Sequence, residues 1–272
     1  MDDTSAPYHA FLAPDMLRSP FLALGQADTS LAIALPLNKA MRLSLAAAAT
    51  RETESAPWLF GPEALPQART TTAAARLDRR LGHAALAFEL GAQWESRQVL
   101  GGRGNGALSL GEGATTAFMG ISSNLPLGLG WALSAQASYA LSRITPGADG
   151  LVTDFTGLRL SAFSASLARQ AVIAKNDWLG LALRQPLRVE AGSGALLLPL
   201  AVEQTVGRTQ VLFTPRTLAL GPSGRELDIE LAYRWLMGER LMVEANGLYQ
   251  FDAGHVAGAR GAALLLRLGG RF

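Results

Sequence analysis

Apolar and polar residues alternate with a period of two along most of the chain. In HAALAFELGAQWES (83–96), apolar side chains take every second position from Ala84 to Trp94, and Glu89, Gln93 and Glu95 take alternate positions of the other face. The stretches LGWALSAQASYALS (129–142), RELDIELAYRW (225–235) and RLMVEANGLYQF (240–251) alternate in the same way. Because successive side chains of a strand point to opposite faces, each stretch predicts a strand with one apolar and one polar face.

The length of these stretches indicates the solvent that the apolar face meets. They run for 10 to 14 residues, whereas an ordinary strand has about 5–6 residues and a tilted membrane-spanning strand has about 9–11. Long strands with clean alternation are typical of outer-membrane β-barrels. The sequence therefore predicts an all-β fold, a transmembrane antiparallel up-and-down β-barrel.

The connections between the predicted strands alternate between short and long. The short ones lie near Asn38-Lys39, Arg80-Leu81, Leu125-Pro126, Lys175-Asn176, Val206-Gly207 and Met237-Gly238, with tight turns near Gly192-Ser193 and Pro222-Ser223. The long ones span roughly 51–67, 98–112, 145–153 and 253–260. This gives twelve strands between Asn38 and Phe272, and a further hairpin before them brings the expected range to 12–14. Residues 1–18 are expected to form a linker or plug-like segment, and residues 19–272 the barrel.

Aromatic residues gather toward both ends of the predicted strands. Rings that bridge apolar and polar surroundings favour the two headgroup regions of a membrane. The predicted interface aromatics are Trp131, Trp178, Trp235 and Phe272 near the short turns, and Trp94, Tyr139, Tyr249 and Phe251 toward the long loops.

The end of the chain, GAALLLRLGGRF, continues the alternation to its last residue. In a membrane an open sheet edge is not tolerated, so the last strand is expected to pair with the first and close the barrel. The final Phe272 is expected at the membrane boundary. A terminal strand that ends on an aromatic residue resembles the signal read by the barrel-assembly machinery of outer membranes.

Composition and charge exclude several classes of protein. Lys plus Arg is 24 and Asp plus Glu is 22, so the chain lacks the clustered positive charge of a nucleic-acid-binding surface. Charged residues make up 17%, below the roughly 25% that is usual for soluble domains. Cysteine is absent, which excludes disulfides and cysteine-based metal sites. The longest apolar run, Ala195 to Val202, has eight residues, too few for a spanning helix of about 20.

The residues that carry chemistry predict no enzyme, no cofactor and no metal site. His9, His83 and His255 lack metal-ligand spacing, and a pairing of His83 with Glu89 is more typical of a solvated interior pair than of a catalytic base. The glycine-rich GGRGNG (101–106) has no helical pattern after it, so it predicts a surface loop rather than a phosphate site. Charged residues that share the polar face are expected to line the lumen as cross-strand ion pairs: Glu89, Glu95, Asp228, Glu230, Arg234, Arg240, Glu244, Arg267 and Arg271.

Two stretches resemble a known family. DWLGLALRQPLRVEAGSGALLLPLAV (177–202) and RTLALGPSGRELDIELAYRW (216–235) are similar to the C-terminal region of subtilisin-like autotransporter proteases of alphaproteobacteria. In that family, a protease passenger is followed by a barrel that ends in Phe. The resemblance covers about the last hundred residues. It implies a translocator or membrane anchor, although the protease domain itself is absent from this sequence.

The sequence thus predicts a non-enzymatic barrel of the bacterial outer membrane that translocates or anchors an upstream passenger. Its expected partners are outer-membrane lipid and lipopolysaccharide, the barrel-assembly machinery and its own passenger, with no nucleic acid. A stand-alone porin or adhesion barrel is the alternative, and a soluble all-β binding domain and a lipid-hydrolysing barrel are the further readings.

Overall fold

The computed structural model describes residues 20–23, 28–52, 68–102, 109–148, 150–205, 208–238 and 241–270. Most of them lie in strands. One helical turn, α1 (Pro20–Ala23), precedes the strands, and a 3-10 turn (Ala253–His255) lies near the end of the chain. The strands, in chain order, are β1 (Thr29–Asn38), β2 (Met41–Glu52), β3 (Ala68–Leu81), β4 (Ala84–Ser96), β5 (Gly113–Gly128), β6 (Trp131–Thr145), β7 (Val152–Thr153), β8 (Leu158–Gln170), β9 (Asp177–Ala191), β10 (Ser193–Thr205), β11 (Arg208–Ala219), β12 (Leu227–Met237), β13 (Leu241–Phe251) and β14 (Arg260–Gly270).

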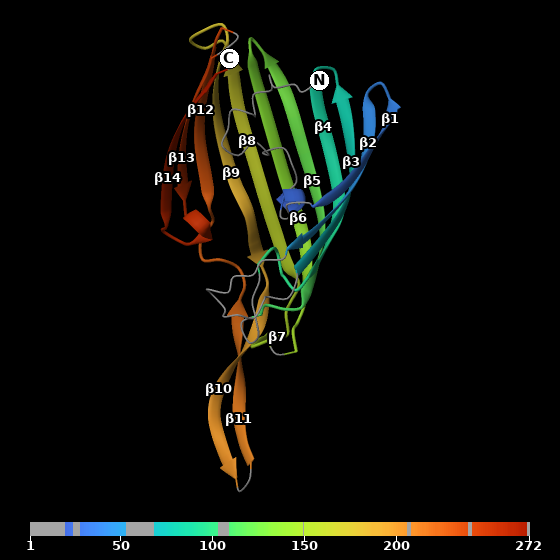
Figure 1. Ribbon diagram of the computed structural model, residues 1–272, viewed down its shortest axis with the longest axis vertical. Helices are drawn as coiled ribbons and strands as arrows, with labels where there is room; N and C mark the ends of the chain where they lie inside the picture. The colour runs from blue at the N-terminus through green and yellow to red at the C-terminus, as the bar shows by residue number, and fades with distance from the viewer. Residues whose placement is uncertain are drawn as a thin grey trace.

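Eleven of these strands form one antiparallel sheet in the order β1-β2-β3-β4-β5-β6-β8-β9-β12-β13-β14. Most neighbours in the sheet are also neighbours in the chain, joined by short turns at one end and longer connections at the other (Figure 1). We call these the short-turn end and the long-loop end. The arrangement confirms the predicted all-β, antiparallel up-and-down fold.

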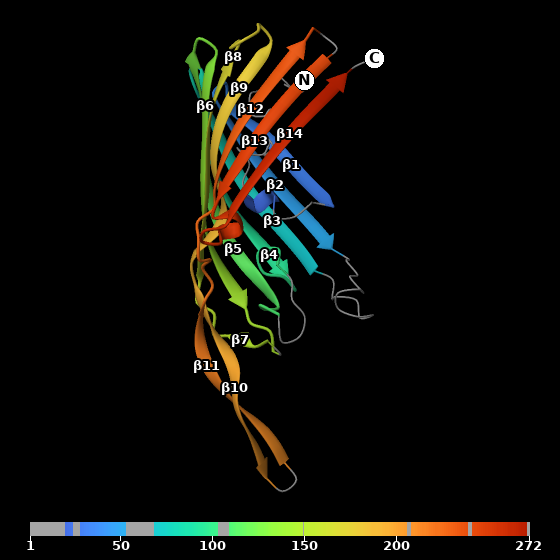
Figure 2. The same cartoon turned by 90° about the vertical axis from the view of Figure 1, so that its left-hand side faces the viewer.

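The sheet is strongly curved, and its two edges are β1 and β14. Views from two directions show it wrapping partly around α1 (Figures 1 and 2). Ten successive antiparallel pairings leave β1 and β14 running in the same direction, because eleven is an odd number. Within the described residues these two edges are not paired with each other. The predicted pairing of the last strand with the first, which would close the barrel, is thus not seen between these two strands.

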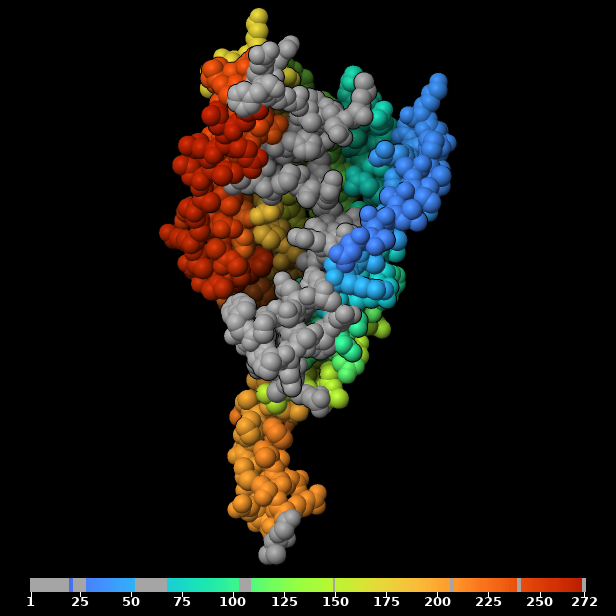
Figure 3. Space-filling model, viewed as in Figure 1, coloured from blue at the N-terminus to red at the C-terminus, as the bar shows by residue number. Residues whose placement is uncertain are grey.

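Strands β10 and β11 leave the main sheet and form a long hairpin beyond its long-loop end. They pair with each other and, over two residues of β10, with β7. In the space-filling view the hairpin stands apart from the rest of the molecule (Figure 3). The structure has 14 described strands, of which eleven form the main sheet, whereas the sequence-based interpretation counted 12–14 barrel strands and placed this hairpin in the barrel wall. Instead β9 pairs directly with β12, from Asp177↔Trp235 to Arg184↔Asp228.

A break in the ladder explains where the hairpin departs. The β9–β12 pairing ends at Arg184, and the β8–β9 register shifts between Phe163↔Gln185 and Ser161↔Arg188. Pro186 lies inside this shift, and its nitrogen has no hydrogen to donate to a ladder. Local irregularities of this kind bend a strand and end its pairing. Beyond them, β9 continues only beside β8, and the chain runs on into β10.

One predicted turn lies in a different place. The sequence indicated a turn near Leu125-Pro126, but β5 continues to Gly128 and the turn consists of Leu129 and Gly130. Both residues have positive φ, 51° and 80°, as the two central residues of a type I′ hairpin turn require. Pro126 lies within β5. A turn prediction based on this proline was therefore wrong by a few residues.

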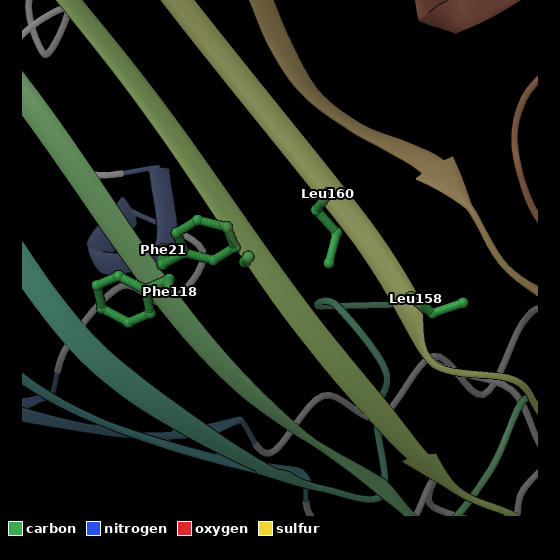
Figure 4. Close-up of a cluster of buried hydrophobic side chains, with 5 residues drawn as sticks. Phe21, Phe118, Leu158 and Leu160 are labelled. Carbon is green, nitrogen blue, oxygen red and sulfur yellow. The ribbon is translucent and has the colours of Figure 1, made fainter.

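The two faces of the main sheet differ sharply in polarity. The face away from α1, the convex face, carries exposed apolar side chains: Leu86, Phe88, Leu90, Met119, Ile121, Leu141, Leu181, Leu183, Ile229 and Leu231. The concave face is mostly polar. Its apolar part is a small cluster in which Phe21 of α1 stacks on Phe118 of β5, with ring centroids 4.8 Å apart, near Ala140, Leu158 and Leu160 (Figure 4). A segment that precedes the sheet in the chain thus contacts its interior.

We expect the hairpin to be dispensable for the main sheet, because β9 already pairs with β12. Replacing residues 196–216 by a short Gly-Ser turn should preserve the β-type circular dichroism of the protein refolded in detergent. The midpoint of thermal unfolding should move by no more than about 4 °C. Replacing residues 229–249, an equally long stretch of the sheet, should abolish folding. Equal loss in both variants would place the hairpin in the wall.

Candidate functional site on the concave face

The concave face carries a continuous set of buried polar side chains. Among the described residues these include Thr70, Thr72, Glu89, Gln93, Thr116, Ser134, Ser138, Ser142, Ser164, Ser166, Asp228, Glu230, Glu244 and Asn246. They occupy alternate positions of strands whose other positions carry the exposed apolar residues. An antiparallel sheet of a soluble protein has the reverse arrangement, with the apolar face buried. The concave face is therefore the candidate functional site.

Asp228 and Glu230 anchor one side of this surface. Asp228 is 2% exposed and forms an ion pair with Arg184 across the β9–β12 ladder, with Nη2 and Oδ2 2.5 Å apart. Its other carboxylate oxygen accepts a hydrogen bond from Gln250 Nε2 at 3.1 Å. Glu230 accepts one from Asn246 Nδ2 at 3.0 Å. Both acidic groups are thus held by donors on neighbouring strands.

A three-residue ion-pair chain continues the lattice toward the short-turn end. The Glu244 carboxylate receives Arg234 Nη2 at 2.5 Å and Arg267 Nη1 at 3.3 Å. Its side chain is 4% exposed, and those of Arg234 and Arg267 are 16% and 61% exposed. The arginine of β12 is therefore the partner that depends most on Glu244, because the arginine of β14 still reaches water.

The opposite side of the concave face is less fully paired. Arg76 Nε lies 2.9 Å from Asp78 Oδ1, and its Nη2 donates to Ser122 Oγ at 3.2 Å. Arg76 and Ser122 border a small hollow in the sheet that is also lined by Glu89, Gly120, Gln136 and Ser138. Glu89 Oε1 and both polar atoms of the Gln93 side chain are buried and have no hydrogen-bond partner.

Glu95, two positions beyond Gln93 on β4, closes the start of a long-loop connection. Its two carboxylate oxygens accept the backbone N–H groups of Leu100 and Gly101, each at 2.8 Å. Leu100 and Gly101 both have positive φ and lie in a tight turn. The carboxylate accepts the hydrogen bonds of their N–H groups in place of a neighbouring strand. Glu95 therefore has a structural partner, in contrast to Glu89 and Gln93.

The two stretches that carry the family resemblance meet at the base of the hairpin. Arg188 donates to the carbonyl oxygens of Gly224 and Pro222, and the Glu190 carboxylate pairs with Arg188 at 2.6 Å and Arg225 at 2.7 Å. Arg225 also donates to Gln185 Oε1, and Ser161 Oγ donates to Glu190. We call Ser161, Gln185, Arg188, Glu190 and Arg225 the loop-end network. It fixes both ends of the β9–β12 connection.

The structure places most of the predicted lumen-lining charges on the concave face. Glu89, Glu95, Asp228, Glu230 and Glu244 are buried, and Arg234 and Arg267 pair with Glu244. Arg240 and Arg271 lie outside the described residues. Sequence reasoning missed Arg76, Arg184 and the loop-end network. Parity alone would have found Arg184, but its acidic partner is visible only once β9 is known to pair with β12.

The predicted interface aromatics that the structure describes lie near strand ends, except Tyr139, and on the convex face, except Trp178. Trp94, Trp131, Tyr249 and Phe251 are exposed near an end of their strands, and Trp235 is half-buried there. Tyr139 is exposed near the middle of β6. Trp178 pairs with Arg234 near the start of β9, which places it on the concave face. Phe272 lies outside the described residues.

No cluster of side chains in the described part of the chain has the composition of a metal site. His83 occupies the turn between β3 and β4, and His255 accepts the Glu226 N–H at 3.0 Å through Nδ1. His9 is outside the described residues. Within the described ranges, the chain has no helix long and apolar enough to cross a membrane.

Comparison with known proteins gives little sequence similarity. No family model matches the chain, and no curated protein matches it. Among solved structures, it is similar to the ferric yersiniabactin uptake receptor of Yersinia pestis, at 11% identity and a TM-score of 0.42. The match covers 88% of this chain, which spans 40% of the receptor chain.

Removing the Glu244 carboxylate should destabilise the sheet, because the largely buried Arg234 would lose the charge partner that pairs with it at 2.5 Å. We expect Glu244→Gln to lower the free energy of unfolding by about 3 kcal/mol. The more exposed Arg267→Gln should cost less than about 1 kcal/mol. Urea titration in lipid vesicles, followed by tryptophan fluorescence, measures both. Similar losses in the two variants would contradict this account of the ion-pair chain.

A second prediction concerns acid. The backbone N–H groups of Gly258 and Arg225 donate to Asp252 at 2.8 and 3.2 Å, and they hold the pKa of this carboxyl below its usual range. Because the pKa is lowered in the folded state, this contribution is complete above about pH 4 and is lost as pH falls through the lowered value. Hydrogen-exchange protection of the Gly258 amide should therefore fall under strongly acidic conditions.

The isosteric Asp252→Asn variant serves as the control for this loop. Its amide oxygen still accepts a hydrogen bond but does not titrate near pH 4. The Gly258 protection factor of the variant should be independent of pH over the same range. Identical pH profiles for the variant and the wild type would show that Asp252 is not the titrating group.

Proposed function

We propose that this chain is a β-barrel of the bacterial outer membrane. The observation that carries the proposal is the reversed polarity of the main sheet. On β4, for example, Leu90 is 49% exposed on the convex face and its neighbour Glu89 is 5% exposed on the concave face. Water disfavours such a large exposed apolar surface, whereas hydrocarbon accepts it when the backbone groups are paired within the sheet.

The ends of the strands support the same proposal. Trp131 starts β6 at the short-turn end, and the Arg169 guanidinium lies over its ring at 5.3 Å from the centroid. An arginine stacked on an exposed indole suits a region where apolar and charged groups meet. In this proposal the aromatic residues near the strand ends contact outer-membrane lipid and lipopolysaccharide. Phe272 belongs to the signal for the barrel-assembly machinery.

We further propose that the barrel translocates or anchors an upstream passenger and has no enzymatic activity or cofactor. The position of α1 supports this role, because Phe21 lies against Phe118 on the concave face, before the first strand. A passenger linker needs this geometry, in which the segment before the first strand lies against the concave face. The family resemblance of residues 177–202 and 216–235 points to the same role.

An adhesion barrel without a passenger is the second candidate. The projecting β10–β11 hairpin favours it, since Leu200, Val202 and Phe213 are 70%, 62% and 51% exposed on a part of the chain that stands away from the sheet. An exposed apolar surface of this kind is typical of contact sites for other molecules. The two candidates share the membrane barrel and differ in whether the passenger crosses it.

One experiment tests both parts of the proposal. A signal peptide and an epitope-tagged passenger are fused upstream of the full chain in a Gram-negative host, and surface exposure of the tag is read by protease treatment of whole cells. We expect export by the wild type. Leu90→Arg, on the convex face at mid-strand, should lose it, because arginine near the bilayer midplane costs about 2–4 kcal/mol.

Leu86→Arg is the matched control, on the same strand and face but beside the short turn. There the cost should be about 0–1 kcal/mol, so export should be close to that of the wild type. Equal behaviour of the two variants would contradict the membrane assignment. A heat-modifiable barrel in the outer membrane with the tag left in the periplasm would instead favour the adhesion barrel.

A further inference from the structure

The concave face of β4 holds two unsatisfied polar side chains on either side of an aromatic contact. Gly91 pairs with Phe118 across the β4–β5 ladder, and a Cβ added to Gly91 would lie 2.3 Å from Phe118 Cζ. The Phe118 ring therefore lies over Gly91. Phe21 stacks on this ring at an interplanar angle of 15° (Figure 4). The absence of a side chain at Gly91 thus creates the seat that receives Phe21.

Glu89 and Gln93 flank this seat on the same face of the same strand. Gln93 is fully buried, and neither its amide nitrogen nor its amide oxygen has a partner; Glu89 is 5% exposed and its Oε1 has none. Buried polar groups are almost always hydrogen-bonded, so unpaired ones call for a specific explanation. Two such side chains beside one aromatic seat indicate a surface built to contact something beyond the sheet.

The chemistry of these groups fits a polypeptide main chain. A glutamine amide offers a planar donor and acceptor, the same pair that a peptide group presents, and a carboxylate oxygen accepts N–H donors. Four residues along a strand span about 13 Å, so Glu89 and Gln93 are spaced like two peptide groups four residues apart in an extended segment, one about two residues before a central side chain and one about two residues after it. The hollow beside Glu89, with the Ser122 and Ser138 side chains in its lining, adds further polar groups at one end.

We propose that Glu89, Gln93 and Phe118 form a peptide-recognition strip for polypeptide that passes through the interior. Phe118 receives one apolar side chain, and Glu89 and Gln93 bind the main chain on either side of it. Phe21 of this chain occupies the aromatic seat in the structure described here. The strip binds peptide groups, which every polypeptide has. Beyond these it requires only one apolar side chain in the bound segment. This inference rests on the proposed translocator function and names what the interior binds.

The test uses the full chain refolded in detergent, with Phe21→Ala to vacate the seat. The probe is a fluorescent peptide that copies residues 16–27, and its binding is followed by anisotropy. A second probe carries N-methyl groups on the peptide nitrogens two residues before and two residues after its phenylalanine. We expect saturable binding of the first probe to the Phe21→Ala chain. Affinity should fall at least tenfold for the methylated probe, for added Gln93→Leu and for added Phe118→Ala.

A thermodynamic cycle that combines the methylated probe with Gln93→Leu measures main-chain recognition by Gln93. In the Gln93→Leu chain, methylation should cost clearly less than in the parent, because one of the partners of the peptide nitrogens is already gone. Gln170→Leu, at the short-turn end of β8, is the matched control and should leave affinity unchanged. Absence of saturable binding, or additive effects in the cycle, would overturn the proposal.

Gel mobility before and after heating is measured on every variant, so that only folded barrels are compared. Failure of peptide binding by a heat-modifiable chain that still exports its passenger would refute the recognition strip alone. A chain that is neither heat-modifiable nor competent in export would refute the proposed function itself.

Discussion

The register between neighbouring strands is the constraint on which the rest of this structure depends. The main-chain ladders run without interruption over most of the main sheet, and each fixes which side chains share a face. A slip of one residue in any ladder would move its glutamates to the convex face and its leucines to the concave face. Hydrogen bonding within the sheet and the separation of polar from apolar side chains are therefore one property, and a membrane demands both.

The register also determines which charged side chains of the sheet form ion pairs. The ion pairs of Asp228 and Glu244 join residues that are directly cross-strand, Asp228 to Arg184 and Glu244 to both Arg234 and Arg267. Removing charges from water is unfavourable unless each finds a partner, and the ladders bring these partners within reach. By contrast, β4 has an equally regular register but leaves Glu89 and Gln93 without partners on the sheet. A site that binds another molecule differs from a structural lattice in this respect.

Much of this arrangement could be predicted from the sequence because alternation is a local signal. The faces of Glu89, Asp228, Glu230 and Glu244 followed from parity, and the long strands from their length. The hairpin could not be placed, since β10 and β11 have the length and apolar content of wall strands and differ only in their pairing. Trp178 was assigned to lipid from its position near a turn, but its cross-strand partner Arg234 decides its face. Phe21 meets Phe118 across about a hundred residues, beyond the range of any local pattern.

Because β9 pairs directly with β12, the main sheet does not depend on the segment that connects these two strands. Arg184 is the last residue of β9 that pairs with β12, and its partner there is Asp228. The 43 residues between them therefore leave the sheet and return to it at adjacent places, and the loop-end network holds both ends. Segments of different length and sequence can therefore occupy this place while the sheet keeps its register. Surface diversification at constant architecture, whether by evolution or by the grafting of a foreign epitope, has a natural location in this connection.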